Sequence, residues 1–400
     1  MKTKWARLLA VAAVFFLFWL DSVSAVEKGG GETGEELSPK AIAEKELKEL
    51  DLGGIRQFWE EIQREYGAFL PESKTGDVTD FIKSAGSFSF KDWGTGLLKY
   101  AFQELLINGK LLGSLLLLTI FSMFLQMLQN SFETASVSKI AYAIVFIVLL
   151  IIALNSFHIA VSYAEKAVGR MVHFTLAFIP LFLALMASGG AVVSAGFFHP
   201  VLLFMANVSG MFVQKIVFPL LFLSVLLNVV STLTEHYKAT QLAGLLRNWS
   251  IGLLGLFMTV FLGVISVQGG AAAVADGVAV RTAKFLTGNL IPVFGRMLTD
   301  AADTVIAASL LLKNMIGVAG VVMLLFSVLF PSVKILLIAF FYKLAASIMQ
   351  PLGGGPIIGC LSIISKSVLY IFAALGIVSM MFFLSLTIII IAGNMQVMIR

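Results

Sequence analysis

The chain has 400 residues, of which 59% are hydrophobic and 13% are charged, whereas roughly 25% of the residues in an ordinary soluble domain are charged. Its mean hydropathy is +0.96, and long apolar runs such as Leu111 to Leu128 recur along the sequence. This composition excludes a soluble globular protein. It predicts an all-α fold in which several helices span a membrane.

Charge divides the chain into two parts. Residues 26–110 carry 11 basic and 16 acidic residues, a net charge of −5, and residues 111–400 carry 14 basic and 6 acidic residues, a net charge of +8. The basic residues of the second part stand singly between apolar segments, so we expect no nucleic-acid partner. With one cysteine, four histidines and no HExxH, Walker or dinucleotide motif, we expect no metal, cofactor or catalytic residue.

The first 25 residues are typical of an export signal. Three basic residues precede the apolar run Leu8 to Leu20, which is shorter than a membrane span, and Val23-Ser24-Ala25 is a signal-peptidase site. We expect cleavage after Ala25, with an uncleaved anchor as the alternative. Either outcome places residues 26–110 outside the cytoplasm.

Residues 26–110 are expected to form a small helical segment after a Gly/Glu-rich linker. Ser38-Pro39 starts a helix that runs to about Leu50. A second helix is indicated by apolar residues at spacings of three and four, which are Ile55, Phe58, Trp59, Ile62, Tyr66 and Phe69. Shorter helices are expected at Val78 to Ser84 and from Asp92 onward. This segment either caps its own membrane domain or docks a partner.

Residues 111–400 form the membrane domain, for which hydropathy predicts seven to nine spans. The expected segments are Leu111 to Gln129, Ile140 to Phe157, Met171 to Ala187, Phe197 to Ser231, Ser250 to Gln268, Thr304 to Phe330, Val333 to Met349 and Ser367 to Ala392. Phe197 to Ser231 is too long for one span and has Pro219 near its middle, so it is either a hairpin or a kinked helix. The two alternatives give equal counts of basic residues in cytoplasmic loops, so the side of the C-terminus stays open.

The stretch from Gly269 to Asp303 is rich in glycine and alanine and contains isolated charges. It is too polar for a span that faces lipid and too apolar for a loop in water. Backbone of this kind survives at membrane depth only where protein or a water-filled cavity encloses it, so we expect a re-entrant or interfacial element with a backbone break at Gly269 and Gly270. Further breaks are expected at Pro180, Pro219 and Pro292.

The following helix is expected to carry a polar stripe. On a helix, Arg296, Asp300, Asp303 and Asn314 fall within about 60° of one another. The stripe is either an interfacial ion-pair patch in which only Asn314 is immersed, or a polar pathway or contact between helices. Lys313 lies on another face, where it snorkels or pairs with a neighbour.

A weak internal repeat accompanies these features. A shift of 112 residues aligns Ile179-Pro180 with Ile291-Pro292 and places a small-residue helix start after each. If the two copies are structural repeats, they resemble the paired broken helices of transporters.

The chain as a whole resembles the stage III sporulation protein AE family of endospore-forming bacteria. The resemblance rests on the signal, the acidic helical segment and three blocks of the membrane domain: GGAAAVADGVAVRTAKFLTGNLIPVFGRMLTDAADTV with LLKNMIGVAGV, then PSVKI, then MQPLGGGPI. It implies a multi-pass protein of the mother-cell membrane around the forespore, within a multiprotein channel. The implied partners are ring-forming proteins, a secretion-type ATPase and a forespore membrane protein, besides membrane lipid.

Two classes of function follow. The first is a non-enzymatic platform or pore of the channel complex, needed for forespore development. The second is a small-molecule permease that acts within or beside that complex. The permease predicts that changes at Asp300, Asp303 or Asn314 abolish transport and leave assembly intact.

Overall fold

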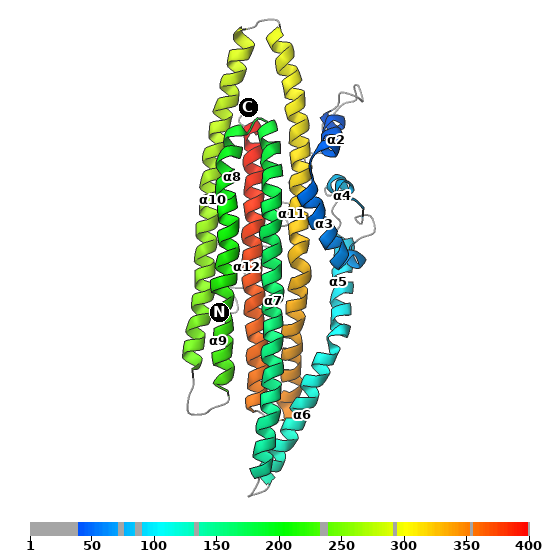
Figure 1. Cartoon of the computed structure of the whole chain (residues 1–400), viewed down its shortest axis with the longest axis vertical. Helices are drawn as coiled ribbons and strands as arrows, with labels where there is room; N and C mark the ends of the chain where they lie inside the picture. The colour runs from blue at the N-terminus through cyan, green and yellow to red at the C-terminus, as the bar shows by residue number, and fades with distance from the viewer. Residues whose placement is uncertain are drawn as a thin grey trace.

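In the part of the chain that the structure describes, the protein is a bundle of very long helices with a group of shorter helices against one side (Figure 1). This all-α architecture, seen in a computed structural model, is the predicted fold class. The described residues are 39–70, 76–84, 90–131, 136–232, 239–290, 294–352 and 355–398. The predicted signal peptide, residues 1–25, lies outside them.

The N-terminal helices form where the sequence predicts them. They are α2 (Pro39–Glu49), α3 (Gly53–Tyr66), the 3-10 turn η2 (Gly67–Phe69), α4 (Val78–Ser84) and α5 (Phe90–Ile107). The five apolar residues spaced along α3 are all buried, and its charged residues face outward. The group lies along the side of the bundle, beside the long helices α7 and α11 (Figure 1).

Six stretches of the described residues are long and apolar enough to span a membrane, fewer than the seven to nine expected. The elements are α6 (Gly109–Ser131), α7 (Ser136–Ser188), α8 (Val192–Phe212), the π-helical turn η4 (Val213–Val217), α9 (Phe218–Val230), α10 (Thr240–Leu290), α11 (Phe294–Met349), the 3-10 turn η5 (Gln350–Leu352) and α12 (Pro356–Met398). The stretch α8–η4–α9 counts as one.

The difference arises because two pairs of expected spans are each a single helix. Ile140 to Phe157 and Met171 to Ala187 both belong to α7, and the two segments that flank Pro331 both belong to α11. The hydropathy minima between them mark polar side chains that bond to neighbouring helices, such as Arg170, and not water-exposed loops. A local hydropathy window does not separate these two cases.

Pro180 and Pro219, where the sequence predicts breaks, both lie within continuous helical stretches. Pro180 lies inside α7, which continues on both sides of it, so the break predicted there is wrong. Pro219 is at the start of α9, directly after the π-helical turn η4, where the missing N–H is accommodated. Phe197 to Ser231 is therefore one continuous helical stretch, and the hairpin alternative is wrong.

The break predicted at Gly269 and Gly270 is also wrong. Helix α10 runs without interruption from Thr240 to Leu290, so the region from Gly269 onward is helical and not re-entrant backbone. A Cβ atom on Gly269 would lie 3.4 Å from Phe198 and Ile388, so small residues here allow neighbouring helices to approach closely. In Figure 1, α10 and α11 continue past the ends of α7, α8 and α12 as a two-helix extension. Pro292, in the connection, lies outside the described residues.

The internal repeat has no structural counterpart. The 112-residue shift aligns the turn between α7 and α8, residues 189–191, with residues 301–303, which lie within α11.

The core of the bundle lies where α7, α11 and α12 pack together. Gly320 of α11 lies directly against α7, because a Cβ atom there would lie 2.3 Å from the ring of Phe178. The small residue is thus required for α11 to lie against α7 at this separation.

Candidate functional site: buried polar contacts at one end of the bundle

Two consecutive residues of α11 bond to the C-terminal part of α12. The Lys313 side chain is 2% exposed, and its Nζ donates to the carbonyl oxygen of Gly393 at 2.6 Å. Asn394 Nδ2 donates to Asn314 Oδ1 at 3.0 Å. These contacts tie α11 to α12 in the interior of the bundle.

An acidic residue of α10 caps the beginning of α8. Asp276 is 1% exposed, and its two carboxylate oxygens accept the backbone N–H groups of Val193 at 2.8 Å and Ser194 at 3.0 Å. The residue before α8, Ala191, has no side chain that could do this. The first N–H groups of a helix need acceptors, and a carboxylate there also complements the helix dipole. Asp276 therefore serves as an N-cap supplied from another helix.

The turn between α7 and α8 completes this end of the bundle. Gly190 adopts φ 94°, a conformation that favours glycine, and its N–H donates to Ala187 O at 2.9 Å. Ser188 Oγ, on the last residue of α7, lies 3.4 Å from Ser309 Oγ on α11. The polar contacts thus connect α7, α8, α10, α11 and α12 close to where α7 ends.

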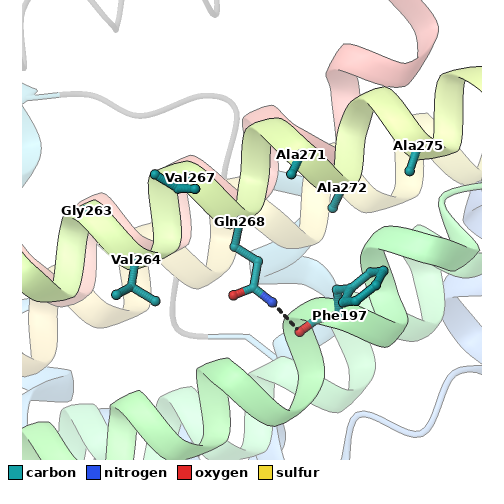
Figure 2. Close-up of a pocket in the computed structure, with 8 residues that line it drawn as sticks. All are labelled: Phe197, Gly263, Val264, Val267, Gln268, Ala271, Ala272 and Ala275. Atoms are coloured by element: carbon teal, nitrogen blue, oxygen red, sulfur yellow. Dashed lines mark hydrogen bonds between the residues drawn. The ribbon is translucent and has the colours of Figure 1, made fainter.

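An apolar groove lies beside these contacts, between α8 and α10 (Figure 2). Its volume is about 720 Å³, and its lining is almost wholly apolar. Small residues of α10, among them Gly263 and Ala271, form one wall, and Phe197 of α8 forms the other. The amide of Gln268 bridges the two helices by donating to Phe197 O at 2.8 Å. The buried ionisable groups Asp276 and Lys313 do not line this groove.

The other residues of the predicted polar stripe cannot be compared with these contacts. Arg296, Asp300 and Asp303 belong to the first turns of α11, but their side chains lie outside the described part of the structure. Their role as a pathway or ion-pair patch stays a prediction. The structure does place Asn314 in a contact between two helices and Lys313 in a pair with a backbone carbonyl, and it adds Asp276 to the same end.

A second set of polar contacts joins the N-terminal helices to the middle of the bundle. Arg170 of α7 forms an ion pair with Glu65 of α3, and its second nitrogen donates to Tyr66 Oη at 3.3 Å. Lys334 of α11 lies 2.9 Å from Glu104 of α5. In sequence these residues appear only as isolated charges in apolar surroundings, and their partners are more than 100 residues away.

Aromatic stacking surrounds these ion pairs. The ring of Tyr66 stacks on Phe330 with centroids 4.1 Å apart, and Trp93 stacks on Phe326 at 3.8 Å. Burial raises the pKa of Tyr66, so its hydroxyl stays protonated and available for hydrogen bonds. The N-terminal helices therefore belong to the same packed core as the bundle.

Among the residues that the structure describes, no group of three or more His, Cys, Asp or Glu side chains is placed to hold a metal ion. The described polar contacts are instead bonds between helices. They fix α8 to α10 and α11 to α12.

Comparison with known proteins identifies the family. A family model for stage III sporulation protein AE matches residues 73–393. The chain belongs to this family. It is 59% identical over 369 residues to stage III sporulation protein AE of Bacillus subtilis (strain 168), an alignment that covers 92% of this chain and 91% of the relative. No solved structure matches the chain.

Membership confirms the resemblance inferred from the sequence and assigns the protein to sporulation. The matched residues include Asp276, Lys313 and Gly393 at the end of the bundle and the helices α4 and α5, whereas α2, α3 and Asn394 lie outside the matched range. Together with six long apolar helices, this describes a multi-pass membrane protein of a sporulation family.

Proposed function

We propose that this protein is a non-enzymatic platform of a multiprotein channel complex between mother cell and forespore. It lies in the mother-cell membrane around the forespore, with residues 26–110 outside the cytoplasm. The proposed partners are ring-forming proteins, a secretion-type ATPase and a forespore membrane protein. Through this complex the protein supports forespore development.

The observation that carries the proposal is the way the N-terminal helices are fixed to the bundle. Helix α3 buries its apolar face against α7 and α11, while Arg56, Glu60, Glu61 and Arg64 remain exposed on the opposite face. Ion pairs to Arg170 and Lys334 hold the group in place. A charged surface on a rigid support is suited to the docking of another protein.

The buried polar residues favour a platform over a permease. Asp276, Lys313 and Asn314 are each engaged in bonds that join helices. A transport site needs polar groups that are free to exchange partners with a substrate. The permease alternative is kept as an outcome of the experiment.

The test compares two variants in a sporulating strain. The charge reversal Glu60→Lys with Glu61→Lys alters the exposed face of α3, and Asn314→Leu removes the amide contact inside the bundle. Lys343→Glu, a charge reversal at an exposed position of α11, is the matched control. Spore yield and co-purification of the ring-forming proteins are measured for each.

A platform predicts that the α3 variant loses both co-purification and spores, whereas the control keeps both. If Asn314→Leu abolishes spore formation while the ring-forming proteins still co-purify at the level of the unmodified protein, the permease is favoured. If the α3 variant retains its partners, the docking role of this surface is refuted.

A further inference from the structure

A small polar cavity lies between α9, α10 and α12, separate from the contacts described above. Its volume is about 230 Å³. Its polar lining comes from Ser224 and Asn228 of α9, Arg247 of α10, and Lys366, Ser367 and Tyr370 of α12. In contrast to the groove of Figure 2, it places two basic side chains around one space.

The two basic residues have no acidic partner in the described part of the chain. The Arg247 guanidinium lies 4.8 Å from the centre of the Tyr370 ring, and its Nε donates a long hydrogen bond to Asn248 Oδ1 at 3.5 Å. The ion pairs of the described residues involve neither Arg247 nor Lys366. The acidic residue that α9, α10 and α12 do carry in their described ranges is Asp276, roughly 40 Å from Arg247 along α10.

This arrangement is electrostatically incomplete. Two cations that share a cavity repel each other, and the repulsion is larger in surroundings of low dielectric constant than in water. Tyr370 lies beside the guanidinium and Asn228 adds an amide that can donate hydrogen bonds. The lining therefore suits an anion with several acceptor oxygens, and a phosphate group has this chemistry.

The surroundings indicate where such a phosphate comes from. Trp249, two residues after Arg247, is 63% exposed, and tryptophan is enriched at the level of lipid headgroups. The outer faces of the same three helices expose Leu223, Leu245 and Leu369, each between 44% and 50% exposed. Acyl chains can lie on these faces while the headgroup occupies the cavity.

We propose that the cavity formed by Asn228, Arg247 and Lys366 binds a phosphate group, and that this phosphate is the headgroup of an anionic phospholipid. The lipid neutralises the two cations and links α9, α10 and α12 at this level of the bundle. The site is independent of the proposed platform role.

The test uses the full-length protein purified in detergent. Binding is measured by native mass spectrometry and by the rise in thermal unfolding temperature on adding phosphatidylglycerol, phosphatidylcholine or inorganic phosphate. The variants are Lys366→Gln, at an exposed position, and the double variant Arg247→Gln with Lys366→Gln. Lys343→Gln, also at an exposed position but not in the cavity lining, is the control for loss of one charge.

Phosphatidylglycerol is expected to bind at least tenfold more tightly than phosphatidylcholine. The Lys366→Gln change should lower the affinity for phosphatidylglycerol by about tenfold, because it removes one charge-assisted contact. The double variant should lower this affinity further, and Lys343→Gln should leave it unchanged. Equal binding of the two lipids, or equal losses in Lys366→Gln and Lys343→Gln, would overturn the proposal. If inorganic phosphate binds and stabilises with the same dependence on Lys366 while the lipid does not, the phosphate site stands and the lipid source is refuted.

Discussion

Replacement of Asp276 by alanine is the sharpest test of how this end of the bundle is held. The carboxylate accepts two backbone N–H groups at the start of α8 and is buried. Each buried donor left without an acceptor costs about 1–3 kcal/mol, so Asp276→Ala should lower the free energy of unfolding by about 2–6 kcal/mol. Asp276→Asn keeps one acceptor oxygen and should lose about half as much.

The assay is reversible unfolding of the purified protein in mixed micelles, followed by circular dichroism. Gln268→Ala is the matched control, because it removes one bond from the same helix to α8 at an exposed position, and it should cost about 1 kcal/mol or less. Hydrogen exchange at the amides of Val193 and Ser194 should accelerate in Asp276→Ala alone. If Asp276→Ala and Gln268→Ala are equally stable, or these amides remain protected, the cap does not hold α8.

Three other predictions follow from the packing. Lys313→Glu should lower the free energy of unfolding by several kcal/mol in the same assay, because it buries a carboxylate against a carbonyl oxygen, whereas Lys313→Met should cost far less; equal effects would contradict this. Gly320→Ala should destabilise by about 1–3 kcal/mol through a clash between α11 and α7, whereas Gly263→Ala, which meets no atom within 4 Å, should be neutral. Lys334→Gln should cost about 1–3 kcal/mol, because the buried Glu104 carboxylate loses its cation and keeps the hydrogen bond from Asn108. It should also speed proteolysis of the N-terminal helices; unchanged cleavage would show that this ion pair does not hold them.

The helices that depend on local signals were predictable from the sequence. Proline at the start of α2 and the three-and-four spacing of Ile55, Phe58, Trp59 and Ile62 specify short helices and the buried face of α3 without knowledge of the rest of the chain. The apolar composition likewise specifies a helical membrane domain. These features require only information from neighbouring residues.

The merging of expected spans into the single helices α7 and α11, and the polar contacts between helices, were not predictable from neighbouring residues. From the sequence alone, Arg170 is interpreted as a loop residue, because its partner Glu65 lies 105 positions away in the chain. Asp276 is interpreted from the sequence as a charge in a re-entrant segment. Its role as an N-cap is apparent only once it is placed beside the start of α8, 83 positions earlier. Glycine and alanine at 269–275 form a regular helix, whose backbone groups bond to one another, and only Gly269 and Ala272 of its described side-chain positions are buried against other helices. Pairings over long sequence separation decide each case.

The length of the apolar surface supports an assembled state. Large apolar side chains are exposed on α10 from Leu242 to Val278, 36 residues apart, which corresponds to about 54 Å of helix. The hydrocarbon core of a bilayer is about 30 Å thick. Roughly 20 Å of this strip therefore extends beyond the hydrocarbon core of the bilayer. Contiguous apolar surface in water is unfavourable, and such surfaces mark interaction sites. We expect a protein neighbour to cover this part of α10, which would accord with the proposed role inside a larger complex.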